Sequence, residues 1–128
     1  MACVREHLAP GGRFVIDVFV PSFRFLLVDP TQRLPLVEYD DPDGAGRVVV
    51  THQSRYDFVT QIKWTKTFHK VPGQATETEG SLDMRMYFPQ ELQALLKYNG
   101  FRLVAAFGGY QGEPLASNFP RQIYVLER

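Results

Sequence analysis

Apolar residues near the start of this chain form one almost continuous run, at residues 13–20 (RFVIDVFV), directly after a Pro-Gly-Gly turn. Before the turn, Val4, His7 and Leu8 recur at helical spacing. Pro cannot continue a helix and Gly accepts backbone angles that other residues avoid, so the helix is expected to end near Leu8. A strand that is apolar on both faces is typical of the middle of an α/β sheet. The pattern therefore predicts a helix end, a turn and a buried strand.

Alternation of apolar and polar positions predicts three further strands, at residues 47–54, 61–70 and 81–87. In the second of these, Ile62, Trp64 and Phe68 share one face, and Lys63 lies among the polar residues of the other. The three strands are expected to form an antiparallel unit. Residues 21–35, which precede it, are too apolar for a free loop and predict a short helix or an extended arm.

The C-terminal part combines a short amphipathic helix with two more strands. Residues 88–101 place three leucines on one helical face. Pro89 suits the first helical position, Gly100 a left-handed cap, and Phe101 the apolar contact that follows such a cap. The remaining pattern predicts a strand, a long loop and a final strand, at residues 102–107, 108–120 and 121–127.

These two flanks resemble the class I S-adenosylmethionine-dependent methyltransferases. In that family a helix, an L-x-P-G-G turn and a buried strand recur around the fifth strand, as at residues 8–20 here. The ending "helix, Gly-Phe, strand, loop, strand" is similar to the family's last helix and its sixth and seventh strands. Small-molecule methyltransferases, including those that act on amino sugars, often carry a β-rich insertion between these parts as a lid or a dimer platform.

The resemblance implies an α+β fold class, with an antiparallel or mixed β-sheet and few helices. It corresponds to the back half of a Rossmann-like fold, from the fifth to the seventh strand, with an antiparallel insertion. We expect a single domain over residues 1–128, in which 1–20 hold the helix end and fifth strand, 21–87 the lid insertion, and 88–128 the last helix and final strands.

The resemblance also implies S-adenosylmethionine as the cofactor of the parent enzyme. In the family this cofactor lies on a Gly-rich turn after the first strand, upstream of the region that this chain resembles. Gly108, Gly109 and Gly112 lead into Glu113 and Pro114 rather than into a helix, so they predict a flexible loop and not a phosphate cradle. We therefore expect the chain alone to bind no cofactor and to be inactive, whether it is a truncated or a natural short product.

Candidate substrate-lining residues lie near the carboxyl end of the first strand, because ligands of open α/β sheets bind there. Asp17, Phe19 and Ser22 occupy this position. Arg85 and Tyr87 are expected to share a face of the third insertion strand, where they would hold an anionic or hydroxylated substrate. The alternatives are that Asp17 caps a helix or bonds loop amides, and that the other two belong to a solvated strand face.

No catalytic residue follows from the sequence. Methyl transfer depends mainly on positioning, and a base is needed only for an acceptor that is protonated at neutral pH. The candidate bases His7, His52 and His69 lie on separate predicted elements, and only the latter two are on insertion strands that could face a substrate. Their spacing does not match a metal site, so no metal is expected.

Composition excludes several other classes of protein. Fourteen basic and fourteen acidic residues leave no net charge, which argues against a nucleic-acid binder. Three lysines around two aromatic residues are the only feature that suggests one: Lys63, Lys66 and Lys70 around Trp64 and Phe68. The single Cys3 excludes an internal disulfide and favours a reducing cytoplasm. The apolar run at residues 14–28 contains Asp17, Pro21 and Arg24 and is too short for a membrane span.

The partners expected are a small-molecule acceptor and further copies of the chain. The first strand would present an unpaired apolar edge, so we expect a homodimer or a larger homo-oligomer, built through that edge or through the antiparallel unit. The alternative function is a non-catalytic β-rich binding or dimerisation module. The sequence leaves open which acceptor is used and whether nitrogen, oxygen or carbon is methylated.

Overall fold

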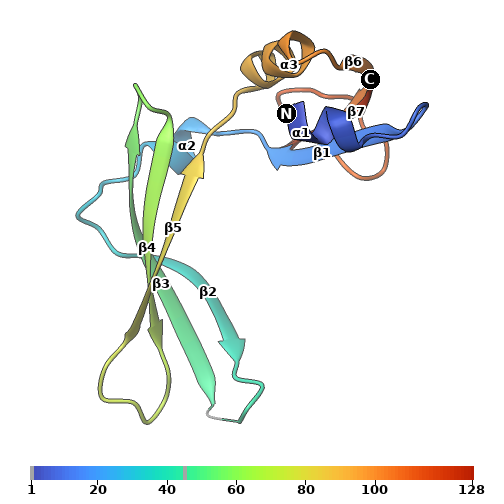
Figure 1. Ribbon diagram of the computed structural model, residues 1–128. Helices are drawn as coiled ribbons and strands as arrows, with labels where there is room; N and C mark the ends of the chain where they lie inside the picture. The colour runs from blue at the N-terminus through green and yellow to red at the C-terminus, as the bar shows by residue number, and fades with distance from the viewer. Residues whose placement is uncertain (1, 45) are drawn as a thin grey trace. The chain divides into compact units, whose positions relative to one another are not determined.

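The computed structural model describes residues 2–44 and 46–128, and the chain in it forms two compact units (Figure 1). Met1, in the predicted helix end, and Ala45, in the predicted insertion, lie outside the described residues. The first unit holds residues up to 21 together with residues 87–128, and the second holds residues 22–86. The expected lid insertion thus corresponds to the second unit, and the single domain stays a prediction.

The first unit contains a three-stranded sheet in the order β1-β7-β6, with β1 at Arg13–Phe19, β6 at Arg102–Phe107 and β7 at Arg121–Glu127. The central strand β7 is antiparallel to both neighbours. In this sheet β1 is an edge strand, paired over its length with β7. The predicted boundaries of β6 and β7 are met to the residue.

Burial on β1 differs from the expectation of a strand that is covered on both faces. Phe14, Ile16 and Val18 pack on the core, whereas Val15, on the other face, is 55% exposed. Both helices of this unit, α1 at Ala2–His7 and α3 at Pro89–Tyr98, contribute to the same core, which explains why only one face is covered.

Helix α3 begins and ends as its sequence predicts. Pro89 is at the first position, where its missing N–H costs no helical bond. At the other end Gly100 has a φ of +80°, and the Phe101 N–H donates to the Leu96 carbonyl at 3.1 Å. This left-handed cap turns the chain into β6 and brings Phe101 into the core. The fully buried members of that core are Leu92, Leu96, Phe101, Tyr124 and Leu126.

The second unit contains a four-stranded antiparallel sheet in the order β2-β3-β4-β5. Its strands are β2 at Leu34–Asp40, β3 at Arg47–Asp57, β4 at Ile62–Lys70 and β5 at Thr78–Arg85. The last three correspond to the predicted strands, although β5 starts earlier and ends at Arg85 rather than at residue 87. The edge strand β2 was not predicted, because Pro35 breaks its pattern. Pro is tolerated at an edge, and the pairing shifts register between Pro35 and Val37.

The apolar segment before β2 forms the predicted short helix, α2 at Phe23–Leu26. Ser22 caps it, and its hydroxyl accepts a hydrogen bond from the Phe25 N–H at 3.3 Å. Leu26 is buried. In the part of the chain that the structure describes, no helix is long and apolar enough to cross a membrane.

Candidate functional site

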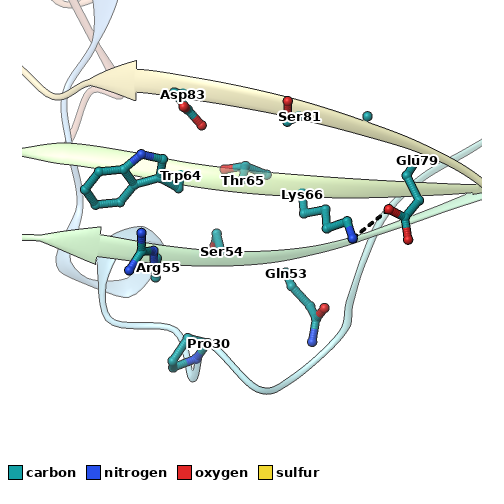
Figure 2. A pocket seen from close by; sticks show the side chains of 11 residues that line it. Pro30, Gln53, Ser54, Arg55, Trp64, Thr65, Lys66, Glu79, Ser81 and Asp83 are labelled. Carbon is teal, nitrogen blue, oxygen red and sulfur yellow. Dashed lines mark ion pairs between the residues drawn. The ribbon is translucent and has the colours of Figure 1, made fainter.

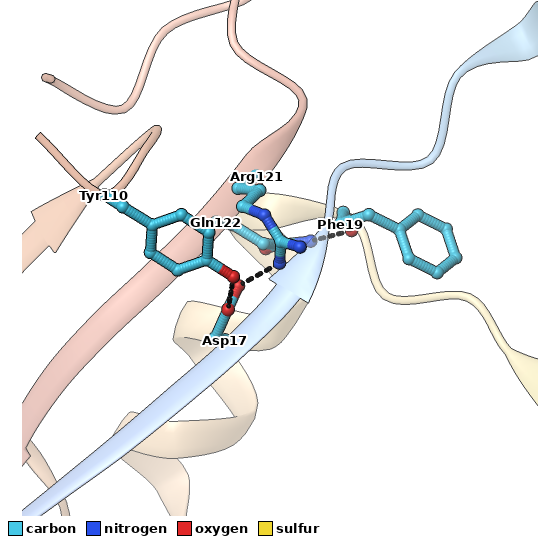
Figure 3. A network of polar contacts seen from close by, with 5 residues as sticks. All are labelled: Asp17, Phe19, Tyr110, Arg121 and Gln122. Atoms are coloured by element: carbon cyan, nitrogen blue, oxygen red, sulfur yellow. Dashed lines mark hydrogen bonds and ion pairs between the residues drawn. The ribbon is translucent and has the colours of Figure 1, made fainter.

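Asp17 is the centre of a polar network in the first unit (Figure 3). Its Oδ1 accepts from Arg121 Nη1 at 2.8 Å, and its Oδ2 accepts from the Tyr110 hydroxyl at 2.6 Å. Tyr110 lies in the loop after β6, and Arg121 is the first residue of β7. The Arg121 guanidinium also lies 4.7 Å from the centroid of the Tyr110 ring. The partners of Asp17 are therefore side chains from two other segments, and not the loop amides or helix end that the alternative expected.

This network keeps Asp17 ionised. The hydrogen bond from Tyr110 and, after it, the contact with Arg121 lower the pKa of the Asp17 carboxyl below its usual value. The same hydrogen bond raises the pKa of the Tyr110 hydroxyl. A carboxylate with a lowered pKa is a weak base, so its chemistry is the holding of a cationic or hydroxylated group rather than proton abstraction.

Gln122 fixes the backbone around this network. Its side chain is fully buried, and Nε2 donates to the Phe19 carbonyl at 3.1 Å and to the Tyr87 carbonyl at 2.6 Å. Its Oε1 accepts from the Tyr124 hydroxyl at 3.1 Å. One amide thus holds the main chain at two of the five candidate residues, Phe19 and Tyr87. The Phe19 ring points away from the Asp17 carboxylate (Figure 3).

The expected pairing of Arg85 with Tyr87 on one strand face is wrong. β5 ends at Arg85, and Tyr87 lies beyond it, half-buried against the core of the first unit. The error arose because the alternating pattern continues for two residues beyond the end of the strand. Arg85 is exposed and contacts the side-chain oxygen of Gln61 and, at 3.3 Å, the Met86 carbonyl.

The candidate residues divide between the two units. Asp17, Phe19 and Tyr87 belong to the first unit, and Ser22 and Arg85 belong to the second. Sequence reasoning missed Tyr110, Arg121 and Gln122. One feature of the sequence does indicate such partners. Asp17 is an ionisable residue inside an apolar strand, and a charged group in that setting needs a polar partner.

The histidines do not gather into a metal site. His7 Nδ1 contacts the Cys3 carbonyl at 2.8 Å, and His69 Nε2 contacts the Thr67 hydroxyl at 3.3 Å. His52 lies on β3, and burial lowers the pKa of its imidazole, with a smaller effect from the charge of Lys63. Among residues 2–44 and 46–128, no group of three His, Cys, Asp or Glu side chains could hold a metal ion.

A hollow of about 520 Å³ lies on the sheet of the second unit, over strands β3, β4 and β5 (Figure 2). The Arg55 guanidinium is 4.4 Å from the centroid of the Trp64 ring, and Lys66 pairs with Glu79 at 2.6 Å. Two cationic side chains, Arg55 and Lys66, and two acidic ones, Glu79 and Asp83, line this hollow. Asp83 is opposite Trp64 in the pairing of β4 with β5. This balance of charge does not suit a nucleic-acid backbone.

No family model matches the chain, and no curated protein matches it. Solved structures do. The CcbJ methyltransferase from Streptomyces caelestis is similar over 98% of this chain and 50% of its own, with a TM-score of 0.79 and 20% identity. An S-adenosylmethionine-dependent methyltransferase from Clostridium acetobutylicum is similar over 98% of this chain and 48% of its own, with a TM-score of 0.68 and 16% identity.

The third is CalS10, an amino pentose methyltransferase from Micromonospora echinaspora, solved with S-adenosylmethionine bound. It matches over 98% of this chain and 47% of its own, with a TM-score of 0.60 and 18% identity. The chain shares its fold with about half of each of these structures. The resemblance and the fold class predicted from the sequence are thereby confirmed, and the chain spans about half the length of the structures that it matches.

Proposed function

We propose that this chain is the C-terminal, substrate-side portion of an S-adenosylmethionine-dependent methyltransferase that acts on a small molecule. The observation that carries the proposal is the likeness to the CcbJ methyltransferase, with a TM-score of 0.79 over nearly the whole of this chain. The CalS10 methyltransferase acts on an amino pentose, so amino sugars are the first acceptor class to test.

The cofactor is expected to lie on the other half of such an enzyme. Neither α2, which has four residues, nor α3, which starts at Pro89 without a preceding glycine, offers the Gly-rich turn onto a helix that holds a nucleotide. We therefore expect these residues not to hold the cofactor on their own. The role proposed for this chain is to bind and orient the acceptor.

Within that role, Asp17 holds a cationic or hydroxylated group of the acceptor, because its carboxylate stays ionised beside Tyr110 and Arg121. Phe19 and Tyr87 of the first unit, and Ser22 and Arg85 of the second, are proposed as further acceptor-lining residues, each within its own unit. Positioning of this kind accounts for most of the catalysis that methyl transfer requires from the protein.

The test is a methyl-transfer assay with labelled S-adenosylmethionine and a panel of amino sugars and other small amines. It uses the chain extended by the coding sequence upstream of it. Arg85→Ala is expected to raise KM, because Arg85 is exposed and is proposed to hold substrate. Arg47→Ala is the matched control. Arg47 is also an exposed arginine, it pairs with Glu38, and it is the first residue of β3, at the other end of the sheet from Arg85. Equal KM values for both variants would mean that Arg85 does not hold the substrate and belongs to a solvated strand face. Absence of methyl transfer to every acceptor tested would contradict the proposed activity.

Assembly and location complete the proposal. The β1 edge and the exposed Val15 support a homodimer or larger assembly. Cys3 is an exposed free thiol, which supports the reducing environment of the cytoplasm.

A further inference from the structure

Polar side chains, two of them buried (Ser54 and Lys63) and four half-buried, form a row on one face of the sheet in the second unit. Strands β3 and β4 bring them together as three neighbouring cross-strand pairs. These pairs are Tyr56 with Lys63, Ser54 with Thr65, and His52 with Thr67. Because side chains two residues apart on a strand share a face, all six point to the same side of the sheet. We call this set the polar row.

Lys63 is the charged member of the polar row. Its side chain is 1% exposed, although alternation placed it on a polar face, and Nζ lies 3.1 Å from the centroid of the Phe25 ring. Among the ion pairs of the described residues none involves Lys63. An aromatic face compensates an ammonium only in part, so the buried charge lacks a full counterion.

Lys63 is next to the middle pair of the row, because Thr65 is two residues away on the same strand and pairs with Ser54. Lys63 and His52 lie two pairs apart, about 13 Å along the strands. Even so, the charge of Lys63 acts on the His52 imidazole. The Ser54–Thr65 pair lies between these two residues in the register.

Three polar atoms in the same row are buried and have no hydrogen-bond partner among the residues that the structure describes: Ser54 Oγ, Thr65 Oγ1 and His52 Nδ1. Ser54 is only 5% exposed. Buried polar groups in proteins are almost always paired, so three such atoms in the row of a buried ammonium call for a hydrogen-bond partner, either water or a bound group. An ammonium and two hydroxyls are all donors, and together they match the oxygens of an anion.

We propose that the polar row binds an oxyanion, the carboxylate or phosphate group of a small molecule. Its oxygens accept hydrogen bonds from Lys63 Nζ and from the hydroxyls of Ser54 and Thr65, and its charge balances the ammonium. The Phe25 ring, which is 38% exposed, covers the ammonium and would move aside for entry. That the anion belongs to the methyl acceptor rests on the proposed function; the binding itself does not.

Anion binding is measured on the 128-residue chain without S-adenosylmethionine, so its failure is separate from a failure of the proposed function. Phosphate and acetate are titrated at constant ionic strength against chloride, and unfolding is followed by the fluorescence of Trp64, the only tryptophan. Saturable stabilisation by phosphate, by acetate or by both is expected, and the stronger of the two identifies the anion class.

Lys63→Met keeps the shape of the side chain and removes the charge, and is expected to weaken anion binding about tenfold or more. Lys66→Met is the matched control, because Lys66 lies on the opposite face and pairs with Glu79, and it should bind as the unmodified chain does. Ser54→Ala provides a second, milder variant, with a severalfold loss expected. Absence of any anion effect beyond chloride, or equal effects in the unmodified chain and Lys63→Met, would overturn the proposal and leave the row to buried water.

Discussion

Asp17 on β1 and Arg121 on β7 lie 104 positions apart in the chain, yet their charged groups meet at 2.8 Å. The register explains the contact, because Phe19 is directly opposite Arg121 and Asp17 is two residues away on the same face. The pair links the start of β7 to the edge strand β1. The Tyr110 hydroxyl donates to the same carboxylate and so links the loop after β6 to β1 as well.

Asp17→Asn is expected to lower the free energy of unfolding by about 1 kcal/mol at pH 7, because the pair is partly exposed and one charge is lost. The folded-state pKa of Asp17 is lowered below its ordinary value of 3.8. Its stabilisation is therefore complete above that value and is lost as the pH falls through the folded-state pKa. Urea unfolding followed by circular dichroism should show a gap between the two proteins at pH 7 that closes in acid. A gap of the same size at pH 7 and at pH 2 would contradict this account.

Gln122→Leu is expected to destabilise the chain by about 3 kcal/mol, because it removes the buried hydrogen bonds that the amide makes with the carbonyls of Phe19 and Tyr87 and with the Tyr124 hydroxyl. Tyr124→Phe is the comparison, and about 1 kcal/mol is expected, since it removes only one end of the network. Equilibrium unfolding in urea measures both. Equal effects of the two substitutions would mean that the amide does not tie these segments together.

Burial lowers the pKa of Lys63 from 10.5 to about 8. Between these two values the unfolded chain binds a proton that the folded chain does not, so stability should rise with pH from about 8 upward and stay flat below. The Lys63→Met chain should be more stable than the unmodified chain by about 2 kcal/mol at pH 7. Its stability should not rise with pH above about 8. Unfolding at pH 7, 8, 9 and 9.5, read by Trp64 fluorescence in low-phosphate buffer, tests it. The same rise of stability with pH in both proteins would mean that another titratable group causes the rise.

Val15→Lys places a charge on the exposed face of the edge strand β1 and is expected to shift any homo-oligomer toward monomer. Val59→Lys is the control, because Val59 is 93% exposed in the turn between β3 and β4. Light scattering over a range of concentrations measures the change. A monomer at high concentration in the unmodified chain would rule out assembly through this edge.

Elements with strong local signals could be predicted from the sequence. Helix α3 has Pro89 at its start and a left-handed Gly100 at its end, and these two residues define it without knowledge of the rest of the fold. Strands β6 and β7 follow from short apolar runs with clear loops on either side. The first strand was also found, although its exposed face was not.

Features that depend on distant segments could not be predicted. Alternation assigned Lys63 to a polar face, whereas in the structure it is buried and its ammonium lies against the ring of Phe25, from an earlier segment. Strand β2 carries Pro35 and needs β3 beside it to form. The partners of Asp17 depend on the pairing of β1 with β7, which no local pattern specifies.

The most direct test of the methyltransferase account is a calorimetric titration of S-adenosylmethionine into two proteins. One is the 128-residue chain, and the other is the same chain extended by the in-frame sequence upstream, where a Gly-rich turn after the first strand is expected. The account predicts no saturable binding to the chain alone and a micromolar dissociation constant for the extended protein. A micromolar dissociation constant for the chain alone, or none for the extended protein, would contradict it.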